Sequence, residues 1–271
     1  MNQPQRTPSD IAFERSGPTG SLPIVLIHAG IADRRMWDPQ WDDLTSTRDA
    51  VRLDLRGFGE STTAPVAALS HPTDVIETVD HLGIGRCHLV GSSMGSGVVT
   101  EVALTRPGLV QSLLLCPPGG SLLAELTPDL QTFFEAERSA LAKGDTDAAV
   151  EANISSWVVG PGRSESEVDA SVTAAVRDMQ RNAFEIADTW GDVDETELDP
   201  PALDRLPDLK IPLLVLFGGH DLETTQDAAR RVVAGAPNAQ QVDWDDVAHL
   251  PSMEKPEPFL ALLSDWVTSH D

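Results

Sequence analysis

The chain has 271 residues, of which 41% are hydrophobic and 23% charged, as expected for a soluble globular protein with one large domain or a domain carrying an insertion. Lys and Arg number 19 against 43 Asp and Glu, a formal net charge of −24, and such a surface repels nucleic acid and anionic membranes. We therefore expect no nucleic-acid partner and no membrane partner.

The sequence contains no targeting or membrane-spanning signal. Its N-terminus lacks the apolar stretch of a signal peptide, and no apolar run reaches the ~20 residues of a membrane-spanning helix. We therefore expect a cytoplasmic protein. Cys87 and Cys116 lie in apolar runs and fit no metal-binding or redox pattern, so we expect two buried free thiols and no metal site.

Short apolar runs alternate with amphipathic segments along most of the chain. The apolar runs predict buried strands at 23–28, 50–54, 86–91, 110–116, 211–217 and 240–244, with residues 11–15 as a first, antiparallel edge strand. The amphipathic segments predict helices at 36–44, 73–82, 94–105, 224–234 and 258–267. This alternation predicts an α/β fold with a mostly parallel central sheet flanked by helices.

The alternation stops between residues 117 and 207. This region is helical and acidic, with three or four amphipathic helices, an internal G-P-G-R turn at 160–163 and no convincing strand. We predict a helical cap (lid) over residues 118–206 and a core domain made of residues 1–117 and 207–271. The aromatic residues of the cap indicate a partly apolar substrate pocket, and packing within the cap itself is the alternative.

The segment L-V-G-S-S-M-G-S-G, residues 89–97, joins a predicted strand to a predicted helix. The pattern Gly91-x-Ser93-x-Gly95 places small residues on both sides of Ser93, which a sharp strand-to-helix turn requires because larger side chains would clash. The helix N-terminus beside Ser93 favours a developing oxyanion. We therefore predict Ser93 as a nucleophile. Ser92 is the lesser candidate, and a chance match in a Gly/Ser-rich loop is the alternative.

A serine nucleophile needs a base and an acid that orients the base. His249 follows the last predicted strand in D-D-V-A-H-L-P, and Asp221 follows the strand at 211–217 in F-G-G-H-D. Loops at the carboxyl ends of parallel strands meet in one crevice, so we predict that Ser93, Asp221 and His249 meet there. The alternatives are a helix N-cap for Asp221 and an exposed loop position for His249. Three acids closer to His249 in the sequence are lesser candidates: Asp243, Asp245 and Asp246.

Five motifs, in this order, make the chain similar to serine hydrolases of the α/β-hydrolase fold. They are I-V-L-I-H-A-G (24–30), D-L-R-G-F-G-E-S (54–61), V-G-S-S-M-G (90–95), F-G-G-H-D (217–221) and A-H-L-P-S-M-E-K-P (248–256). The resemblance covers nearly the whole chain and implies a cap inserted after the sixth strand; the order Ser, Asp, His is that of this fold. M-W-D-P-Q (36–40) and S-S-W-V-V-G-P-G-R (155–163) resemble small bacterial hydrolases of the 3-oxoadipate enol-lactonase type.

The resemblance implies an oxyanion hole formed by the backbone N–H groups of Gly30 and Met94. Ala29 stands where a glycine is commoner, so the N–H of Ile31 is an alternative first donor. His28 is expected to support its loop by hydrogen bonding. For the substrate pocket we expect four residues: Ile31, Trp157, Trp190 and Leu250.

The sequence therefore predicts a serine hydrolase, monomeric or homodimeric, that cleaves an ester or lactone of a small to medium, partly apolar substrate through an acyl-enzyme, without a metal or organic cofactor. A serine at position 93 argues against epoxide hydrolases and haloalkane dehalogenases, which use Asp there. Three alternatives stay open. One is hydrolysis of a carbon–carbon bond in a diketone, and another is perhydrolase or cofactor-free oxygenase chemistry on the same residues. The third is a member of the fold that binds a small molecule without turning it over.

Overall fold

The structure is a computed structural model that describes residues 4–124 and 126–271. Residues 1–3 of the predicted core and residue 125 of the predicted cap lie outside the described residues. The described chain forms one eight-stranded sheet in the order β1-β2-β4-β3-β5-β6-β7-β8. The strands are β1 (Gln5–Arg6), β2 (Ala12–Ser16), β3 (Ile24–Ile27), β4 (Ala50–Leu53), β5 (Cys87–Ser93), β6 (Val110–Pro118), β7 (Leu213–Gly218) and β8 (Ala239–Trp244).

The sheet is parallel from β4 to β8 and antiparallel at its other end. β3 pairs in parallel with both β4 and β5, and β5, β6, β7 and β8 continue the parallel order. β2 pairs antiparallel with β4, as expected for the segment at 11–15, but it is not the edge strand. The two-residue strand β1 pairs outside it, a contact too short to leave a sequence pattern. The serine turn at the end of β5 therefore lies near the middle of the sheet.

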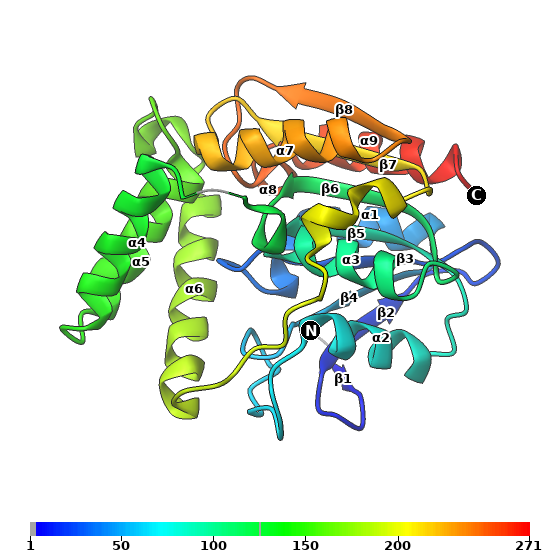
Figure 1. Cartoon of the computed structure of the whole chain (residues 1–271), viewed down its shortest axis with the longest axis horizontal. Helices are drawn as coiled ribbons and strands as arrows, with labels where there is room; N and C mark the ends of the chain where they lie inside the picture. Colours follow the sequence, from blue (N-terminus) through cyan, green and yellow to red (C-terminus); the bar gives the residue numbers. More distant parts are fainter. Residues whose placement is uncertain (1–3, 125) are drawn as a thin grey trace.

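Helices cover both faces of the sheet (Figure 1). Within β3, Ile24 and Leu26 belong to one buried cluster, while Val25 and Ile27 belong to the other, so both faces are buried as the continuous apolar runs predict. The helices packed on the first cluster are α1 (Asp38–Thr47), α8 (Pro251–Glu254) and α9 (Pro256–Thr268). Those packed on the second are α2 (His71–His81), α3 (Met94–Thr105) and α7 (Glu223–Gly235).

The segment between β6 and β7 is helical and stands at one end of the sheet (Figure 1). It contains α4 (Pro128–Leu141), α5 (Thr146–Asn153), the π-helical turn η3 (Ile154–Val159) and the long α6 (Ala170–Trp190). Short 3-10 turns add η1 (Arg34–Trp37) in the core, and η2 (Gly120–Leu122), η4 (Glu165–Glu167) and η5 (Ala202–Asp208) along this segment. We call residues 118–206 the cap, as predicted; that it forms a separate unit stays a prediction.

Three contacts join the cap to the core domain. The Arg163 guanidinium forms a buried ion pair with Glu254 at 2.6 Å. The Trp190 indole N–H donates to the Thr62 carbonyl at 2.9 Å, and a Cβ placed on Gly57 would lie 3.0 Å from the Trp190 ring. These contacts place the cap helices over the carboxyl ends of the strands.

Candidate functional site

Ser93 stands at the junction of β5 and α3 with a backbone conformation that few side chains adopt. Its φ of 53° and ψ of −116° lie in the left-handed half of the Ramachandran map, where a non-glycine residue is strained. α3 begins at the next residue, so the first amides of this helix, which have no acceptor within the helix, lie beside the Ser93 hydroxyl. The turn presents a hydroxyl to a region of partial positive charge.

The small residues around Ser93 are required by close backbone contacts. A Cβ placed on Gly95 would lie 2.5 Å from the His28 carbonyl oxygen and 2.6 Å from that of Ile27. A Cβ on Gly91 would collide with the carbonyl oxygen of Gly95. The glycines therefore allow the turn to pack directly against the end of β3.

The two serines of this turn differ in their access to solvent. Ser93 is partly exposed and lines a cavity between the core and the cap. Ser92 is fully buried, and its hydroxyl has no hydrogen-bond partner within residues 4–124 and 126–271. Only the Ser93 hydroxyl is therefore accessible from this cavity.

His249 and Asp221 form a buried pair at the same end of the sheet. The Asp221 carboxylate lies 2.8 and 2.9 Å from His249 Nδ1, and neither residue is more than 3% exposed. Asp221 Oδ1 also accepts the backbone N–H of Leu222 at 2.8 Å, which holds the carboxylate in place. With a carboxylate at Nδ1, the ring carries its proton there, and Nε2 is left as the basic nitrogen.

The acids nearest to His249 in the sequence face elsewhere. Asp243 accepts hydrogen bonds from the Gln241 side chain, Asp246 pairs with Lys255, and Asp245 is exposed. No hydrogen bond joins the Ser93 hydroxyl to the His249 ring among the described residues. Both residues nevertheless line one cavity, so they face the same space.

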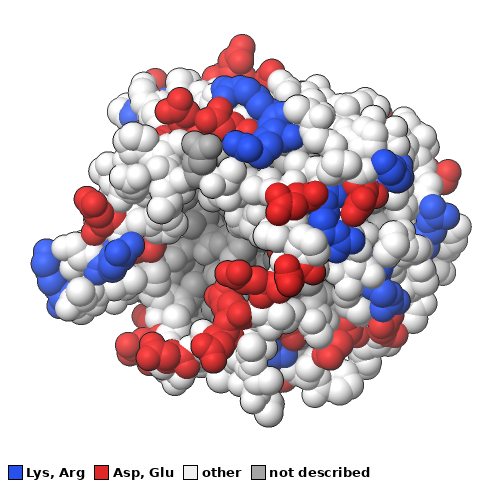
Figure 2. All heavy atoms as spheres, viewed as in Figure 1, with Lys and Arg blue, Asp and Glu red and all other residues white. Residues whose placement is uncertain are grey.

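This cavity has a volume of about 650 Å³ and lies between the sheet and the cap. Gly30, Ser93 and His249 line it from the core, and Phe133 and Trp157 from the cap. Figure 2 shows this face of the molecule hollowed, with acidic side chains along one edge of the hollow. The volume is in the range of small-molecule sites.

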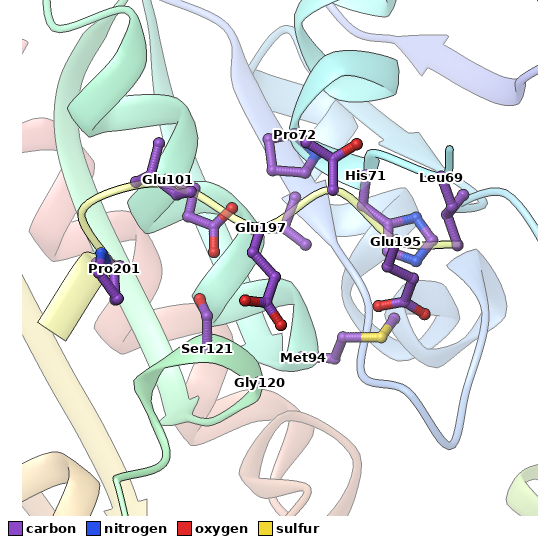
Figure 3. Close-up of a pocket in the computed structure, with 14 residues that line it drawn as sticks. Leu69, His71, Pro72, Met94, Glu101, Gly120, Ser121, Glu195, Glu197 and Pro201 are labelled. Carbon is purple, nitrogen blue, oxygen red and sulfur yellow. The ribbon is translucent and has the colours of Figure 1, made fainter. Parts of the chain in front are cut away.

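A second cavity of about 430 Å³ adjoins the first. The two cavities share Leu69, His71, Met94 and Glu195 among their lining residues. Figure 3 shows His71 and Glu195 at one side of this second cavity, with Met94 below them. Burial lowers the pKa of His71 to about 4, so its ring is neutral at neutral pH.

The loop after β3 places Gly30 next to the serine turn. A Cβ on Gly30 would lie 3.5 Å from Met94 Cβ, so the two predicted oxyanion donors are neighbours. Neither the Gly30 N–H nor the Ile31 N–H has a hydrogen-bond acceptor among the described residues. Both amides are thus free to bind a ligand, and the choice between them stays a prediction.

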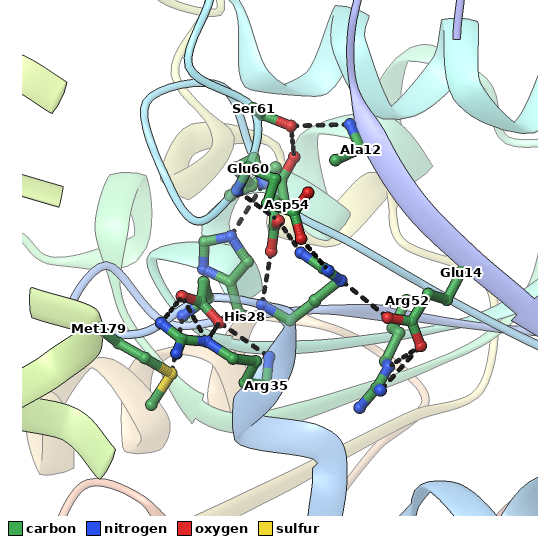
Figure 4. A network of polar contacts seen from close by, with 12 residues as sticks. Ala12, Glu14, His28, Arg35, Arg52, Asp54, Glu60, Ser61 and Met179 are labelled. Atoms are coloured by element: carbon green, nitrogen blue, oxygen red, sulfur yellow. Dashed lines mark hydrogen bonds and ion pairs between the residues drawn. The ribbon is translucent and has the colours of Figure 1, made fainter. Parts of the chain in front are cut away.

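A buried polar network fixes this loop (Figure 4). His28 Nδ1 donates to the Ala29 carbonyl at 2.8 Å, and His28 Nε2 accepts the Leu55 N–H at 2.9 Å. Asp54 accepts the backbone N–H of Arg34 at 2.8 Å and pairs with its guanidinium. Both ring nitrogens of His28 are therefore occupied, and burial lowers its pKa, so His28 supports the loop and is not a base.

The structure brings three of the four expected pocket residues to the cavity. Ile31, Trp157 and Trp190 line it. Leu250 does not line it; this side chain is fully buried in the hydrophobic cluster beneath. Its place in the sequence beside His249 gives no indication of direction, because consecutive residues in a loop point to different sides.

The sequence reasoning missed several residues that line the cavity. Glu137, Asn153 and Gln180 bring polar groups from three different cap helices, and Phe58 and His71 come from the core. The three polar cap residues lie on amphipathic helices, where polar side chains are expected to face solvent. No signal in a single sequence distinguishes a polar residue facing a cavity from one facing water.

Two negative findings hold for the described part of the chain. Its His, Cys, Asp and Glu side chains form no group of three or more that could hold a metal ion. None of its helices is both long enough and apolar enough to cross a membrane.

Cys87 and Cys116 are buried free thiols, as expected, and burial raises the pKa of both.

The sequence matches a family model described as "Alpha/beta hydrolase family" over residues 24–262. The chain belongs to this family. The sheet order, the helices on both sheet faces and the turn that carries Ser93 agree with that assignment. The protein is therefore a member of a hydrolase family.

Its relatives include esterases and lactonases at low identity. It is 26% identical over 261 residues to (E)-2-((N-methylformamido)methylene)succinate hydrolase of Acinetobacter baylyi, covering 90% of each chain. It is 22% identical over 260 residues to 3-oxoadipate enol-lactonase 1 of the same species, covering 96% of this chain and 93% of that one. A thermophilic esterase from Thermogutta terrifontis has the same fold, with a TM-score of 0.76, 27% identity and coverage of 99% and 98%.

Proposed function

We propose that this alpha/beta hydrolase cleaves an ester or lactone through an acyl-enzyme, with Ser93 as nucleophile, His249 as base and Asp221 as the acid that orients the base. One observation carries the proposal. Ser93, in a strained left-handed conformation, opens into the cavity that His249 also lines, while Nδ1 of the His249 ring meets the buried Asp221 carboxylate. This arrangement supports nucleophilic catalysis by a serine hydroxyl.

In the first half-reaction, His249 Nε2 takes the Ser93 proton as Oγ bonds to the substrate carbonyl carbon. The carbonyl π electrons move to its oxygen and form a tetrahedral oxyanion. When this intermediate collapses, the bond to the leaving oxygen breaks, and His249 returns the proton to the leaving alcohol. In a lactone, that alcohol stays part of the acyl group. Asp221 stabilises the imidazolium throughout.

In the second half-reaction, His249 removes a proton from water as the water oxygen attacks the acyl carbon. The Ser93 Oγ–acyl bond then breaks, Oγ regains its proton from His249, and the acid leaves. The Gly30 and Met94 amides are the proposed donors to both oxyanions, each contributing about 3–4 kcal/mol of transition-state stabilisation as in other serine hydrolases.

The missing hydrogen bond between Ser93 and His249 is compatible with this mechanism. Hydrogen bonds between a nucleophile and its base are often long in the absence of substrate and shorten in the reactive complex. The His249 ring is already held at Nδ1 by Asp221 and packed against Trp157.

Relatives named for ester and lactone hydrolysis support the choice of substrate class. One is named for lactone hydrolysis and one solved structure is an esterase. The apolar wall of Phe133, Phe134 and Trp157 suits an acyl chain of small to medium size. Oligomeric state, monomer or homodimer, stays a prediction.

The test compares Ser93→Ala with Ser92→Ala in the hydrolysis of p-nitrophenyl butyrate and of a δ-lactone. We expect S93A to lose at least about 1,000-fold in kcat, because the nucleophile is gone. S92A should keep activity, because the Ser92 hydroxyl faces the protein interior. Turnover by S93A close to wild type would exclude Ser93 as the nucleophile. Product analysis with a diketone substrate separates ester from carbon–carbon hydrolysis.

A further inference from the structure

Three cap helices each contribute one polar side chain to the wall of the cavity that Ser93 lines. Glu137 comes from α4, Asn153 from α5 and Gln180 from α6. The surrounding cap residues Phe133, Phe134 and Phe184 are apolar. Because burying a polar group without a partner costs free energy, a polar cluster in an apolar wall requires an explanation.

The amide nitrogen of Asn153 is bonded within the protein. Its side-chain NH₂ donates to the Ala149 carbonyl at 3.0 Å and to Glu137 Oε2 at 2.6 Å, and the residue is 2% exposed. Both of its donor hydrogens are thus used. Asn153 therefore acts as a support that holds the Glu137 carboxyl at the cavity wall, while Glu137 Oε1 accepts no hydrogen bond within residues 4–124 and 126–271.

Gln180 is the group without a partner. It is 4% exposed, and its side chain makes no hydrogen bond to any described residue. Its Oε1 is shielded from solvent and unsatisfied. Leaving the polar atoms of a buried amide unpaired costs roughly 1–3 kcal/mol each, so this amide points to a polar group that arrives with a ligand.

The charged residues around the cavity determine which charge that ligand can carry. Glu137, Asp192 and Glu195 line the cavity, whereas Arg56 is its only lining Lys or Arg among the described residues. The Arg56 guanidinium is already neutralised by Asp74, to which it donates two hydrogen bonds of 2.7 and 3.0 Å. No free cation is therefore available there to bind a substrate carboxylate.

The adjoining cavity extends the same negative field. Its lining includes Glu101, Glu195 and Glu197 and no Lys or Arg among the described residues, and Figure 3 shows these three carboxylates around one space. Burial raises the pKa of both Glu101 and Glu137, which is the behaviour of carboxyl groups without a cation beside them. An entering cation would offset that cost, and an entering anion would increase it.

We propose that Glu137 and Gln180 form a subsite for the remote end of the substrate, which selects a hydrogen-bond-donating group, best a protonated amine, and rejects a carboxylate. The proposal rests on the proposed function, because it assumes that the same cavity holds the ester or lactone. Glu137 Oε1 accepts from the donor group at the wall that Gln180 also lines, while the acyl carbon lies at Ser93. The substrate class is then an ester or lactone of an amino or amide-bearing acid.

The experiment uses three p-nitrophenyl esters of similar length whose remote ends differ in charge. They are p-nitrophenyl 6-aminohexanoate, p-nitrophenyl heptanoate and mono-p-nitrophenyl adipate. For the wild-type protein we expect kcat/KM to be roughly 10-fold higher for the ammonium ester than for the neutral ester, and lower again for the carboxylate ester, because charged hydrogen bonds are the strong ones. Equal values for all three, or a preference for the carboxylate, would overturn the subsite.

Two variants on the same helix separate the subsite from the general charge of the surface. Glu137→Gln keeps the shape and the acceptor for Asn153 but removes the charge, so the ratio of ammonium to neutral ester should fall by roughly 10-fold. Glu135→Gln removes one exposed charge from α4 and should leave the ratio unchanged. If E135Q and E137Q changed the ratio equally, the preference would come from the surface field alone.

A binding measurement keeps the subsite testable even if no ester is cleaved. In the S93A background we expect 1-hexylamine to raise the melting temperature, hexan-1-ol to raise it less, and hexanoate to have no effect. The effect of hexylamine should disappear in S93A/E137Q. A lack of ester hydrolysis by the wild type would count against the proposed function, whereas equal shifts for amine and acid would count against this subsite.

Discussion

The indole ring of Trp157 lies against the imidazole ring of His249, with 4.4 Å between the ring centroids, so a cap residue touches the proposed base directly. The backbone strengthens this contact, because the His249 N–H donates to the Trp157 carbonyl at 3.2 Å. Phe133 in turn packs edge-on against Trp157, with 5.2 Å between their centroids. The position of the base therefore depends on the cap as well as on Asp221.

Trp157→Ala should lower both stability and kcat. Removing a buried aromatic ring of this size costs about 3–5 kcal/mol of unfolding free energy, and the His249 ring loses one of its two supports. Trp157→Phe, which keeps an aromatic face, should restore most of kcat. The measurements are urea unfolding and steady-state kinetics at a temperature where each variant is folded. If W157A and W157F reduced kcat equally, the ring contact would have no positioning role.

The glycines of the serine turn should tolerate no side chain. Gly95→Ala would place Cβ 2.5 Å from the His28 carbonyl oxygen and 2.6 Å from the Ile27 carbonyl oxygen. Both are backbone atoms that cannot move aside. We expect a loss of about 3 kcal/mol or more in unfolding free energy. Gly85→Ala is the matched control, since nothing lies within 4 Å of its Cβ. A stable, active G95A protein would mean that the turn differs from the one described.

The sequence was sufficient to predict this turn because its constraint is local. Gly91, Ser93 and Gly95 must be adjacent to a strand end and a helix start, and α3 begins at Met94 as expected. Each predicted strand begins and ends within two residues of the observed bounds, because strands buried on both faces are continuous apolar runs. β1 was missed, because two residues with no apolar pattern are held only by their pairing with β2.

Residues whose role depends on contacts between distant segments could not be predicted. Arg163 and Glu254 both lie in segments that resemble other hydrolases of this fold. Nothing in a single sequence indicates that they form an ion pair. Leu250 was expected in the pocket and lies in the core instead. Glu137 and Gln180 face the cavity because of how the cap helices pack, which no single helix pattern records.

The buried ion pair between Arg163 and Glu254 should stabilise the loop that carries His249. Glu254 also accepts the backbone N–H of Ala248 at 2.7 Å, next to His249. Arg163→Met leaves a buried carboxylate without its cation, and we expect a loss of about 3–5 kcal/mol in unfolding free energy. Lys255→Met, which breaks an exposed pair with Asp246, should cost no more than about 1 kcal/mol. Similar losses for the two variants would show that the buried pair has no special role.

His71 should make the protein less stable in acid. Burial lowers its pKa to about 4, against ~6.5 in the unfolded chain. Between these values the unfolded state binds more protons than the folded state, so stability falls as the pH falls from 6.5 to 4 and the loss levels off below 4. The full loss from this residue is up to about 3 kcal/mol.

His71→Leu removes this titration without removing a hydrogen bond to Nδ1, which has no partner in the described structure. The difference in unfolding free energy between pH 7 and pH 4.5, measured with urea, should therefore be smaller in H71L than in the wild type. Carboxylate titrations contribute equally to both proteins and cancel. An identical pH dependence in the two proteins would mean that the His71 ring is solvated.

Labelling with a fluorophosphonate, followed by peptide mass mapping, tests the reactivity of Ser93 most directly. We expect one adduct per chain, located on Ser93, lost in Ser93→Ala and formed much more slowly in His249→Ala and Asp221→Asn, because an unassisted serine hydroxyl is a poor nucleophile. Complete loss of ester hydrolysis should accompany complete labelling. An adduct on Ser92 or any other residue, or ester hydrolysis that persists when Ser93 is fully labelled, would contradict the assignment.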